Sequence, residues 1–411
     1  MRILFINPIG DLGGAERVLL ANLKALRQVC PDWQLCLLLC GGGSLTALAE
    51  ELGVEVKVLP LPDRLSQSGD SGLKGQGKLT GTIRLVLRLA IALPAFFNYL
   101  IRLRQILRAI DPNLIHSNGI KTHILLSLAS PANIPIIWHI HDYYGSRPLV
   151  AKLLSHLSGS AKLGIAISKS VATDAAAILP RLPLAVVYNT VDCDRFSPAG
   201  TESLSKPAEP PNLIRIGLVA TFACWKGQTV FLAAAAQMMR KKPDPLVQFY
   251  VVGGPIYQTT GSQWSLTDLQ TQAVQLGIQD KVDFLGFQTN VSQVYRGLEI
   301  VVHASTQPEP FGLSIVEGMA CGKPVIVAQA GGAAELFTHN YDAYGVPPGD
   351  ASALADAMQY LVDRPQARQA IGFQARQTVL KRFNSDRLGE PLLAIYQTIL
   401  SARVKCSSII N

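Results

Sequence analysis

The feature that most constrains the fold is an alternation of short apolar runs and longer segments with helical spacing. At the start of the chain, residues 3–7 have the character of a buried strand, 10–14 of a turn and 15–27 of a helix. Strands joined by helices form a parallel sheet that is covered on both faces. The alternation therefore predicts a doubly wound α/β fold. Further strands are predicted at 34–39, 54–59, 114–116, 136–140, 163–166 and 185–188.

The same alternation begins again after a break. Residues 197–212, SPAGTESLSKPAEPPN, lack an apolar period and have the composition of a linker. A chain of 411 residues is long enough for two domains of roughly two hundred residues each. We therefore expect two Rossmann-like domains at 1–196 and 213–380, a C-terminal helical segment at 381–411, and the binding loops of both sheets around one cleft. Strands of the second domain are predicted at 214–219, 247–252, 281–285, 300–303 and 324–327.

The composition is that of a globular protein with an anionic partner. Hydrophobic residues make up 48% of the chain and charged residues 16%, which excludes a disordered protein. The net charge of +8 favours binding to a nucleotide, a nucleic acid or a membrane surface, but it does not choose among them. A nucleic-acid-binding protein is not expected, because the sequence has no groove motif that combines aromatic and basic residues.

The cysteines and the apolar runs predict a cytoplasmic protein. The seven cysteines are odd in number and lack CxxC spacing, which is typical of free thiols in a reducing compartment. The first apolar run breaks at Pro8 and Gly10 and is too short for a signal peptide. A membrane-spanning helix is not expected, because Arg84, Arg88 and Pro94 interrupt the longest apolar stretch.

The segment from 307 to 335, QPEPFGLSIVEGMACGKPVIVAQAGGAAE, is the richest in candidate site residues. Two prolines hold Glu309 in an extended loop, and a helix is predicted to begin after Gly312. The free amides of Gly312 and Leu313 then form an anion site, and Glu317 lies one turn into the helix, where it can bind a diol such as a ribose. An isolated pair of glutamates is more often simply solvated, but the surrounding glycines, prolines and apolar helix make this pair less generic.

Three other loops carry candidate residues. Lys226-Gly227 follows the first strand of the second half, where a lysine can pair with a phosphate, although a surface lysine is an equal alternative. Gly13 and Gly14 lie in a strand-to-helix turn whose backbone can approach a phosphate or an acceptor. This turn is not a GxGxxG fingerprint, which argues against a dinucleotide-dependent oxidoreductase. His141 follows an apolar strand and shares a strand face with a second histidine, of which one is expected to be structural.

Taken in sequence order along residues 10–335, these segments resemble the motifs of retaining glycosyltransferases with the GT-B fold, specifically glycosyltransferase family 4. Glu309 and Glu317 match the E-x7-E signature, and GMACGKPVIV matches its continuation, with Gly318 where alanine is commoner. Lys226-Gly227 is similar to the family's K-G step. The other matching stretches are GDLGGAERV at 10–18, HD at 141–142, NTVDCDRFSP at 189–198, VVGGP at 251–255, DKVDFLGF at 280–287 and GGAAE at 331–335.

The resemblance implies a transfer of a sugar, most simply a hexose, from a nucleotide sugar to a lipid-linked or polysaccharide acceptor. It implies that Glu317 binds the ribose, Glu309 assists catalysis beside the donor sugar, Lys226 binds the diphosphate and His141 approaches the donor sugar. Many family members have an arginine where this chain has Thr221, which puts diphosphate binding there in doubt. The implied donor-binding positions are Gly13, Gly14, Thr221, Lys226, Val282, Gly312, Leu313 and Glu317.

No cofactor and no catalytic metal are expected, since the nucleotide sugar is a substrate. The string Asp192-Cys193-Asp194 has the form of a metal-binding DxD motif of another glycosyltransferase fold. Its place just before the predicted linker favours a structural role instead.

A basic and apolar segment is the last feature. No acidic residue lies between Asp70 and Asp111, and large apolar side chains fill the same window. Such a helix can lie on an anionic membrane surface, or it can pack on its own domain with a solvated basic edge. The protein is therefore expected to be cytoplasmic, either free or peripheral at the inner face of a membrane. The basic residues of the segment are Lys74, Lys78, Arg84, Arg88, Arg102, Arg104 and Arg108.

Two other functions stay open at this point. One is a sugar-nucleotide epimerase on the same fold, against which the E-x7-E and K-G context argues. The other is a membrane-associated binding protein with a degenerate site, which Thr221 and the basic segment favour and the retention of Lys226, Glu309 and Glu317 disfavours.

Overall fold

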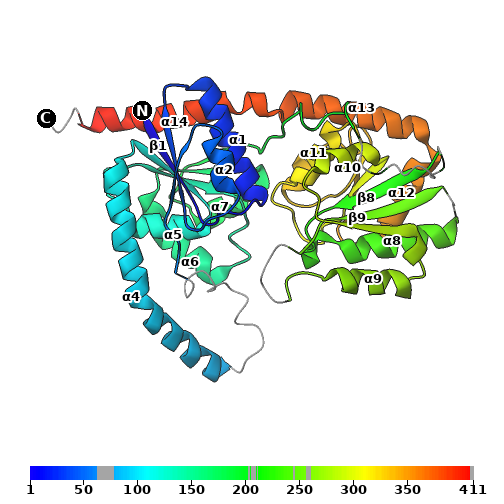
Figure 1. Cartoon of the computed structure of the whole chain (residues 1–411), viewed down its shortest axis with the longest axis horizontal. Helices are drawn as coiled ribbons and strands as arrows, with labels where there is room; N and C mark the ends of the chain where they lie inside the picture. Colours follow the sequence, from blue (N-terminus) through cyan, green and yellow to red (C-terminus); the bar gives the residue numbers. More distant parts are fainter. Residues whose placement is uncertain are drawn as a thin grey trace. The chain divides into compact units, whose positions relative to one another are not determined.

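The chain forms two compact units in a computed structural model (Figure 1). Unit 1 comprises Met1–Val187 and Asp386–Asn411, and unit 2 comprises Tyr188–Ser385. The structure describes residues 1–62, 78–201, 204, 210, 212–243, 246–255 and 261–407, with side chains outside 78–92 and 402–407. Lys74 lies outside these residues, and the side chains of Lys78, Arg84 and Arg88 lie outside those described.

Unit 1 is built on a parallel sheet of seven strands in the order β3-β2-β1-β4-β5-β6-β7. The strands are β1 (Arg2–Asn7), β2 (Gln34–Leu39), β3 (Glu55–Val58), β4 (Leu114–Asn118), β5 (Ile136–Ile140), β6 (Leu163–Ala166) and β7 (Leu184–Val186). The helices are α1 (Gly14–Val29), α2 (Leu45–Glu50), α4 (Lys78–Ile110), α5 (Ile120–Ala129), α6 (Pro148–Leu157), α7 (Lys169–Ile178) and α14 (Gly389–Ser407).

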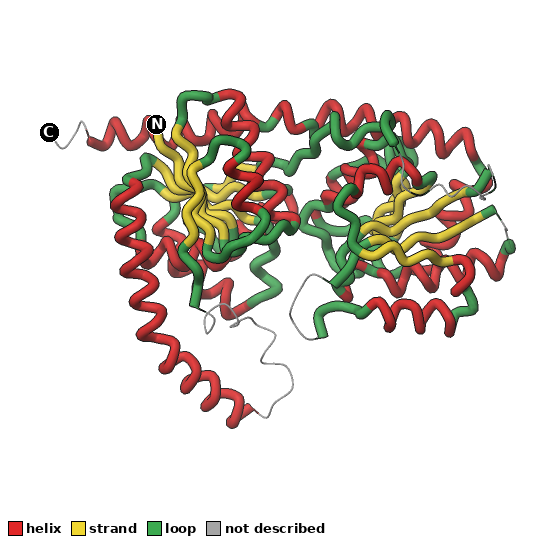
Figure 2. The backbone as a smooth tube through the Cα atoms, in the orientation of Figure 1, coloured by secondary structure: helices red, strands yellow, loops and turns green. Residues whose placement is uncertain are grey.

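Unit 2 repeats this plan with six parallel strands in the order β10-β9-β8-β11-β12-β13. The strands are β8 (Ile214–Val219), β9 (Val247–Val252), β10 (Val282–Gly286), β11 (Ile300–His303), β12 (Val325–Ala328) and β13 (Tyr344–Val346). The helices are α8 (Gln228–Lys241), α9 (Leu266–Gln275), α10 (Val291–Gly297), α11 (Leu313–Ala320), α12 (Ala351–Asp363) and α13 (Pro365–Arg382), with a 3-10 turn η3 (Cys224–Lys226). Figure 2 shows helices on both faces of each sheet.

Apolar residues on successive elements form the two cores. The central strands β1, β4 and β5 are buried along almost their whole length, as expected for a sheet covered on both faces. Leu19, Leu23 and Leu26 on one side of α1 pack into the same core. The two Rossmann-like parallel sheets confirm the predicted fold class, and the carboxyl ends of the strands in each sheet lie at one edge.

The unit boundaries differ from the predicted domains at two places. Residues 197–212 fall inside unit 2, which begins at Tyr188. The C-terminal helical segment is divided, since α13 belongs to unit 2 and α14 returns to unit 1. The reason is burial: Leu392 and Tyr396 of α14 complete the core of unit 1, where α14 packs on α1.

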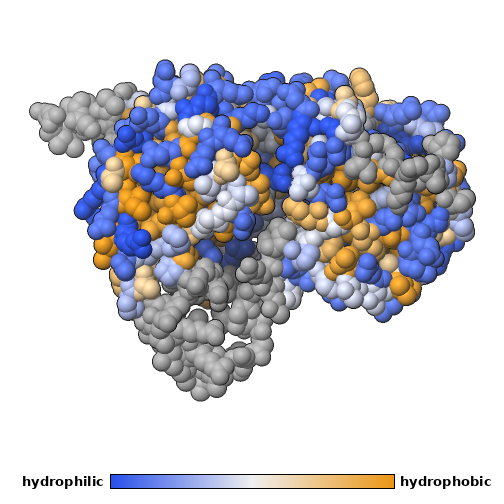
Figure 3. Space-filling view, in the orientation of Figure 1, coloured by the Kyte–Doolittle hydropathy of each residue, from blue (hydrophilic) through white to orange (hydrophobic). Residues whose placement is uncertain are grey.

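Helix α4 presents an apolar stripe to solvent. Leu93, Phe97 and Ile101 are exposed at intervals of four residues, whereas Tyr99 and Leu103 of the same helix are buried. Figure 3 shows hydrophobic side chains gathered on the face of unit 1 that carries the C-terminal half of α4. Among the described residues, no helix is long and apolar enough to cross a membrane.

Candidate active site

In unit 2, the loops that follow β8 and β11 meet at a glycine. Gly227 has φ +79°, and a Cβ built on it would lie 1.8 Å from the carbonyl oxygen of Ala304. Glycine therefore allows the end of η3 to touch the backbone that leaves β11. This contact brings Lys226, the last residue of η3, next to the loop that carries Glu309.

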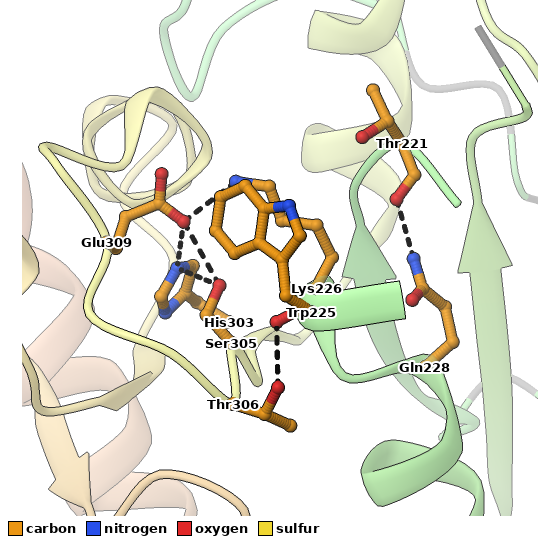
Figure 4. A network of polar contacts seen from close by, with 8 residues as sticks. All are labelled: Thr221, Trp225, Lys226, Gln228, His303, Ser305, Thr306 and Glu309. Atoms are coloured by element: carbon orange, nitrogen blue, oxygen red, sulfur yellow. Dashed lines mark hydrogen bonds and ion pairs between the residues drawn. The ribbon is translucent and has the colours of Figure 1, made fainter. Parts of the chain in front are cut away.

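Glu309 is a buried carboxylate whose Oε2 has three partners (Figure 4). The Nζ of Lys226 lies 2.7 Å from Oε2, the Oγ of Ser305 3.0 Å and the Nε2 of His303 3.2 Å. Burial raises the pKa of Glu309, but the charge of Lys226 and the hydrogen bond from His303 more than offset it and hold the pKa far below its usual range. Glu309 is therefore ionised, and both the imidazole N–H and the serine hydroxyl donate to it.

The backbone on either side fixes Glu309. Its N–H donates to the carbonyl of Ala330 at 3.3 Å, and its carbonyl accepts from the N–H of Gly332 at 2.7 Å. The loop that follows β12 thus holds the backbone of Glu309 in place from the other side.

Helix α11 begins beside this carboxylate, as predicted. Gly312 is the N-cap residue with φ +102°, and Leu313 is the first helical residue. Glu317, one turn further, accepts a hydrogen bond of 3.0 Å from the hydroxyl of Tyr295 on α10. The first turn of α11 lies beside Glu309, and apart from the N–H of Ile315, which donates to the carbonyl of Gly312 at 3.0 Å, its amides have the position at a helix start that binds anions.

Thr221 lies on the other side of η3, just after β8. Its carbonyl accepts a hydrogen bond of 2.7 Å from the Nε2 of Gln228 on α8 (Figure 4). Its hydroxyl is buried and has no hydrogen-bond partner in the described part of the chain.

Val282 is not brought together with these residues. It is the first residue of β10, at the amino end of the sheet, and its side chain packs in the hydrophobic core of unit 2. Lys226, Glu309 and Gly312 lie beyond the carboxyl ends of the parallel strands, which is the opposite edge. The predicted donor-binding position at Val282 is therefore a core position.

In unit 1, His141 and the Gly13-Gly14 turn are joined by a chain of hydrogen bonds. The Nε2 of His141 lies 2.7 Å from the Oδ1 of Asn118, and the Nδ2 of Asn118 donates to Asn7 at 2.6 Å. Asn7 donates to Glu16 at 3.1 Å, and Glu16 accepts the N–H of Gly13 at 3.1 Å. These hydrogen bonds follow the carboxyl ends of β5, β4 and β1 to the start of α1.

The direction of these hydrogen bonds determines the tautomer of His141. Burial lowers the pKa of His141 to about 4, so the ring is neutral at pH 7. Because Asn118 uses its Oδ1 as the acceptor, the proton of the ring lies on Nε2 and leaves Nδ1 as the acceptor atom. Burial also raises the pKa of Glu16, partly offset by the hydrogen bond from Asn7.

His139, on β5, is structural. Its Nδ1 lies 3.0 Å from the Nε2 of His116, whose Nδ1 contacts the hydroxyl of Tyr396 on α14. All three side chains are buried, and burial lowers the pKa of both histidines. This agrees with the expectation that one of the two strand-face histidines is structural.

Six residues of the hydrogen-bond networks around Glu309 and Glu317 and between His141 and Gly13 were not predicted. Each is a polar residue at the end of an apolar strand or in the loop or helix beside it, so a buried polar residue at a strand's carboxyl end is the signal that identifies most of them. They are Asn7, Glu16, Asn118, Tyr295, His303 and Ser305.

Asp192 has the local role of a turn residue. Its Oδ1 accepts the N–H groups of Asp194 and Arg195 at 3.1 and 3.0 Å. Within the described ranges, no group of three His, Cys, Asp or Glu side chains is placed to hold a metal ion.

A shallow pocket of about 550 Å³ lies elsewhere in unit 2. Residues of β13 and α12, among them Tyr344 and Tyr360, line it. It contains none of the predicted site residues, so it is separate from the site around Glu309.

Comparisons with known proteins match both halves of the chain. Residues 12–195 match the family model Glycosyltransferase Family 4, and residues 201–378 match Glycosyl transferases group 1. A D-inositol 3-phosphate glycosyltransferase of Saccharomonospora viridis is 33% identical over 220 residues, which are 52% of this chain and 49% of the relative. The lipopolysaccharide core biosynthesis mannosyltransferase LpsB of Rhizobium meliloti is 26% identical over 53% of this chain and 62% of its own length. The chain thus spans less than two thirds of either relative.

Solved structures match the whole fold. Anabaena Alr3699/HepE in complex with UDP and glucose has a TM-score of 0.76 and 25% identity, with 97% of this chain and 99% of that chain covered. The sucrose-phosphate synthase of Thermosynechococcus elongatus has a TM-score of 0.75 and 18% identity, with 98% and 100% covered, and shows likeness of fold alone. The chain therefore has the GT-B fold and is built from the two glycosyltransferase domains that these family models describe.

Proposed function

We propose that this chain is a glycosyltransferase that moves a sugar from a nucleoside diphosphate sugar to an acceptor, with the donor bound by unit 2. The observation that carries the proposal is the Lys226–Glu309 pair beside the first turn of α11. It lies beyond the carboxyl ends of parallel strands, where doubly wound sheets bind ligands. The likeness to HepE, whose structure holds UDP and glucose, supports a nucleotide-sugar donor.

Each group near this pair has a defined task in the proposed donor complex. Lys226 and the amides of Gly312 and Leu313 bind the diphosphate and stabilise the charge that develops on it as the sugar leaves. Glu317, held by Tyr295, accepts hydrogen bonds from the ribose hydroxyls. The buried hydroxyl of Thr221 supplies a neutral donor where many family members carry an arginine.

Glu309 is the proposed catalytic carboxylate. It stays ionised and lies beside the lysine that binds the diphosphate, so it can stabilise positive charge on the sugar as the bond to phosphate breaks. In unit 1, we assign His141 to the donor sugar, and the backbone of Gly13 and Gly14 to a phosphate or an acceptor. The resemblance to family 4 supports transfer with retention of the anomeric configuration, which NMR coupling constants of the product can test.

Nucleotide binding tests the proposal first. Thermal unfolding of the protein is measured with UDP, GDP, ADP and CDP, for wild type, Lys226→Ala and the matched control Lys241→Ala, a solvent-exposed lysine of the same unit. We expect one base to raise the unfolding temperature in wild type and in the control but not in Lys226→Ala. An absence of any shift in folded wild-type protein would overturn the donor site and favour a degenerate binding protein.

Product analysis without an acceptor separates a transferase from an epimerase. A transferase releases the nucleoside diphosphate and free sugar slowly by transfer to water. An epimerase instead changes the configuration of the sugar. Accumulation of an epimerised sugar nucleotide without release of nucleoside diphosphate would contradict the transferase proposal.

We also propose that unit 1 docks on an anionic lipid surface through α4, which suits a lipid-linked acceptor. Leu93, Phe97 and Ile101 are exposed, and so are Arg104 and Arg108 on the same helix. At about 100° per residue, these five side chains lie within about 80° of one another around the helix axis. The stripe thus combines apolar surface with two cations and lies next to the buried side of α4, which carries Tyr99, Leu103 and Leu107.

Vesicle sedimentation tests this surface. Wild type should bind vesicles containing phosphatidylserine at low salt, and Phe97→Ser with Ile101→Ser should lose most of this binding. Phe373→Ser is the matched control, because Phe373 is 62% exposed but lies on α13 of unit 2. The proposal would be refuted if the α4 variant and the control bound vesicles equally well. It would also be refuted if wild type did not bind them.

A further inference from the structure

The ammonium group of Lys226 binds Glu309 in the structure and is also the proposed ligand of the donor diphosphate. In the structure its Nζ is 2.7 Å from Glu309, and it also lies 3.9 Å from the centroid of the Trp225 ring. The proposed donor complex requires the same ammonium to bind a diphosphate. A diphosphate carries more negative charge than one carboxylate, so its binding draws Lys226 away from Glu309.

Glu309 is too buried to lose its lysine without other support. Its side chain is 8% exposed, and an ionised carboxylate in such a place needs hydrogen-bond donors. His303 and Ser305 supply two, at 3.2 and 3.0 Å from the same oxygen that Lys226 contacts.

These two donors are fixed in a way that Lys226 is not. His303 is the last residue of β11, a central strand paired on both sides, and Ser305 follows two positions later. Both are buried, at 5% and 1% exposure, and the Oγ of Ser305 is also 3.0 Å from the Nε2 of His303. They cannot follow Lys226 toward a ligand.

We propose that His303 and Ser305 are positioning residues, which hold the Glu309 carboxylate in place for the sugar once the donor diphosphate has drawn Lys226 away. This inference rests on the proposed function. It separates two tasks within one cluster: Lys226 serves donor binding, whereas His303 and Ser305 serve the chemical step through Glu309.

The two tasks predict opposite kinetic signatures. Ser305→Ala removes a hydrogen bond to a charged group and should lower kcat about 10- to 100-fold. It should change the Kd of UDP and the KM of UDP-glucose by no more than about threefold, because the phosphate ligands are intact. Lys226→Ala should instead raise both by about tenfold or more.

Conservative variants separate positioning from packing. Ser305→Thr keeps the hydroxyl and should recover most of the lost kcat. His303→Gln keeps an N–H donor and should retain more activity than His303→Leu. Release of UDP from UDP-glucose is the readout for kcat, and calorimetric titration with UDP reports binding and proper folding of each variant.

Glu309→Gln gives a test that needs no turnover. If the ammonium is shared, loss of the competing carboxylate should tighten UDP binding by threefold or more. Weaker UDP binding in this variant would overturn the inference that Lys226 leaves Glu309 to bind the diphosphate. Equal kcat in Ser305→Ala and wild type, or a rise in Kd that matches the loss of kcat, would overturn the positioning role. Failure of wild type to bind any nucleoside diphosphate would instead refute the proposed function itself.

Discussion

Replacing Lys226 by methionine should destabilise the free protein because it leaves a buried charge without its cation. Methionine is close in length to lysine and keeps the apolar stem packed. The side chains of Lys226 and Glu309 are 19% and 8% exposed, so solvent screens the pair weakly. Removing one partner of a buried pair costs about 3–5 kcal/mol. Since His303 and Ser305 still bind Glu309, we expect the lower end, about 3 kcal/mol.

The double variant Lys226→Met with Glu309→Gln should recover most of this loss. Without the carboxylate there is no charge to compensate, and the amide can accept the hydrogen bonds from His303 and Ser305. The free energy of unfolding in urea, measured for wild type, both single variants and the double variant, gives the coupling energy of the pair. A coupling below about 0.5 kcal/mol would refute the reasoning, since that is the value of independent sites.

The pH dependence provides a second check with a definite sign. In wild type the pKa of Glu309 is depressed, so its contribution to stability is complete above the ordinary carboxyl pKa of 4.5 and is lost as the pH falls below that value. In Lys226→Met the pKa of Glu309 rises, because the charge and the hydrogen bond of Lys226 no longer oppose the effect of burial. The stability difference between wild type and Lys226→Met should therefore shrink as the pH falls from 7 to 4. A difference that stays constant over this range would contradict the assigned cause.

Three further variants test other contacts. Gly227→Ala should lower the free energy of unfolding by at least about 2 kcal/mol, because the new Cβ would meet the carbonyl of Ala304 and the φ of this residue is +79°. The matched control Gly277→Ala, at φ +70° and in open space, should lower the free energy of unfolding by about 1 kcal/mol. Tyr396→Phe should lower the free energy of unfolding of unit 1 by about 1–3 kcal/mol, because it removes a buried partner of a histidine, and urea unfolding that matches wild type would contradict this. Asn118→Leu should lower kcat for transfer about tenfold by freeing the tautomer of His141, with urea unfolding as the control for folding.

Most of the fold could be predicted because its signals are local. Apolar runs between turn residues predicted the strands of both sheets, and several predicted spans, such as Gln34–Leu39 and Val247–Val252, agree with the observed bounds. Strand β13, Tyr344–Val346, was missed because its three residues include a glycine, are followed by two prolines and form no apolar run. The return of α14 to unit 1 was also missed, since a helical period does not say which core a helix packs against.

The sequence by itself determined the two parallel sheets, the glycine that opens α11 and the presence of Lys226, Glu309 and Glu317 in loops and a helix end. These features depend on residue type and spacing along short segments. Only the tertiary structure decided that Lys226 pairs with Glu309, 83 positions away, and that His303 and Ser305 share the same oxygen. It also decided that Val282 is a core residue and that Asn118, Asn7 and Glu16 link His141 to Gly13. The physical reason is that burial and hydrogen bonding between strand ends arise only when the sheet aligns those ends, and no local pattern in the chain encodes that alignment.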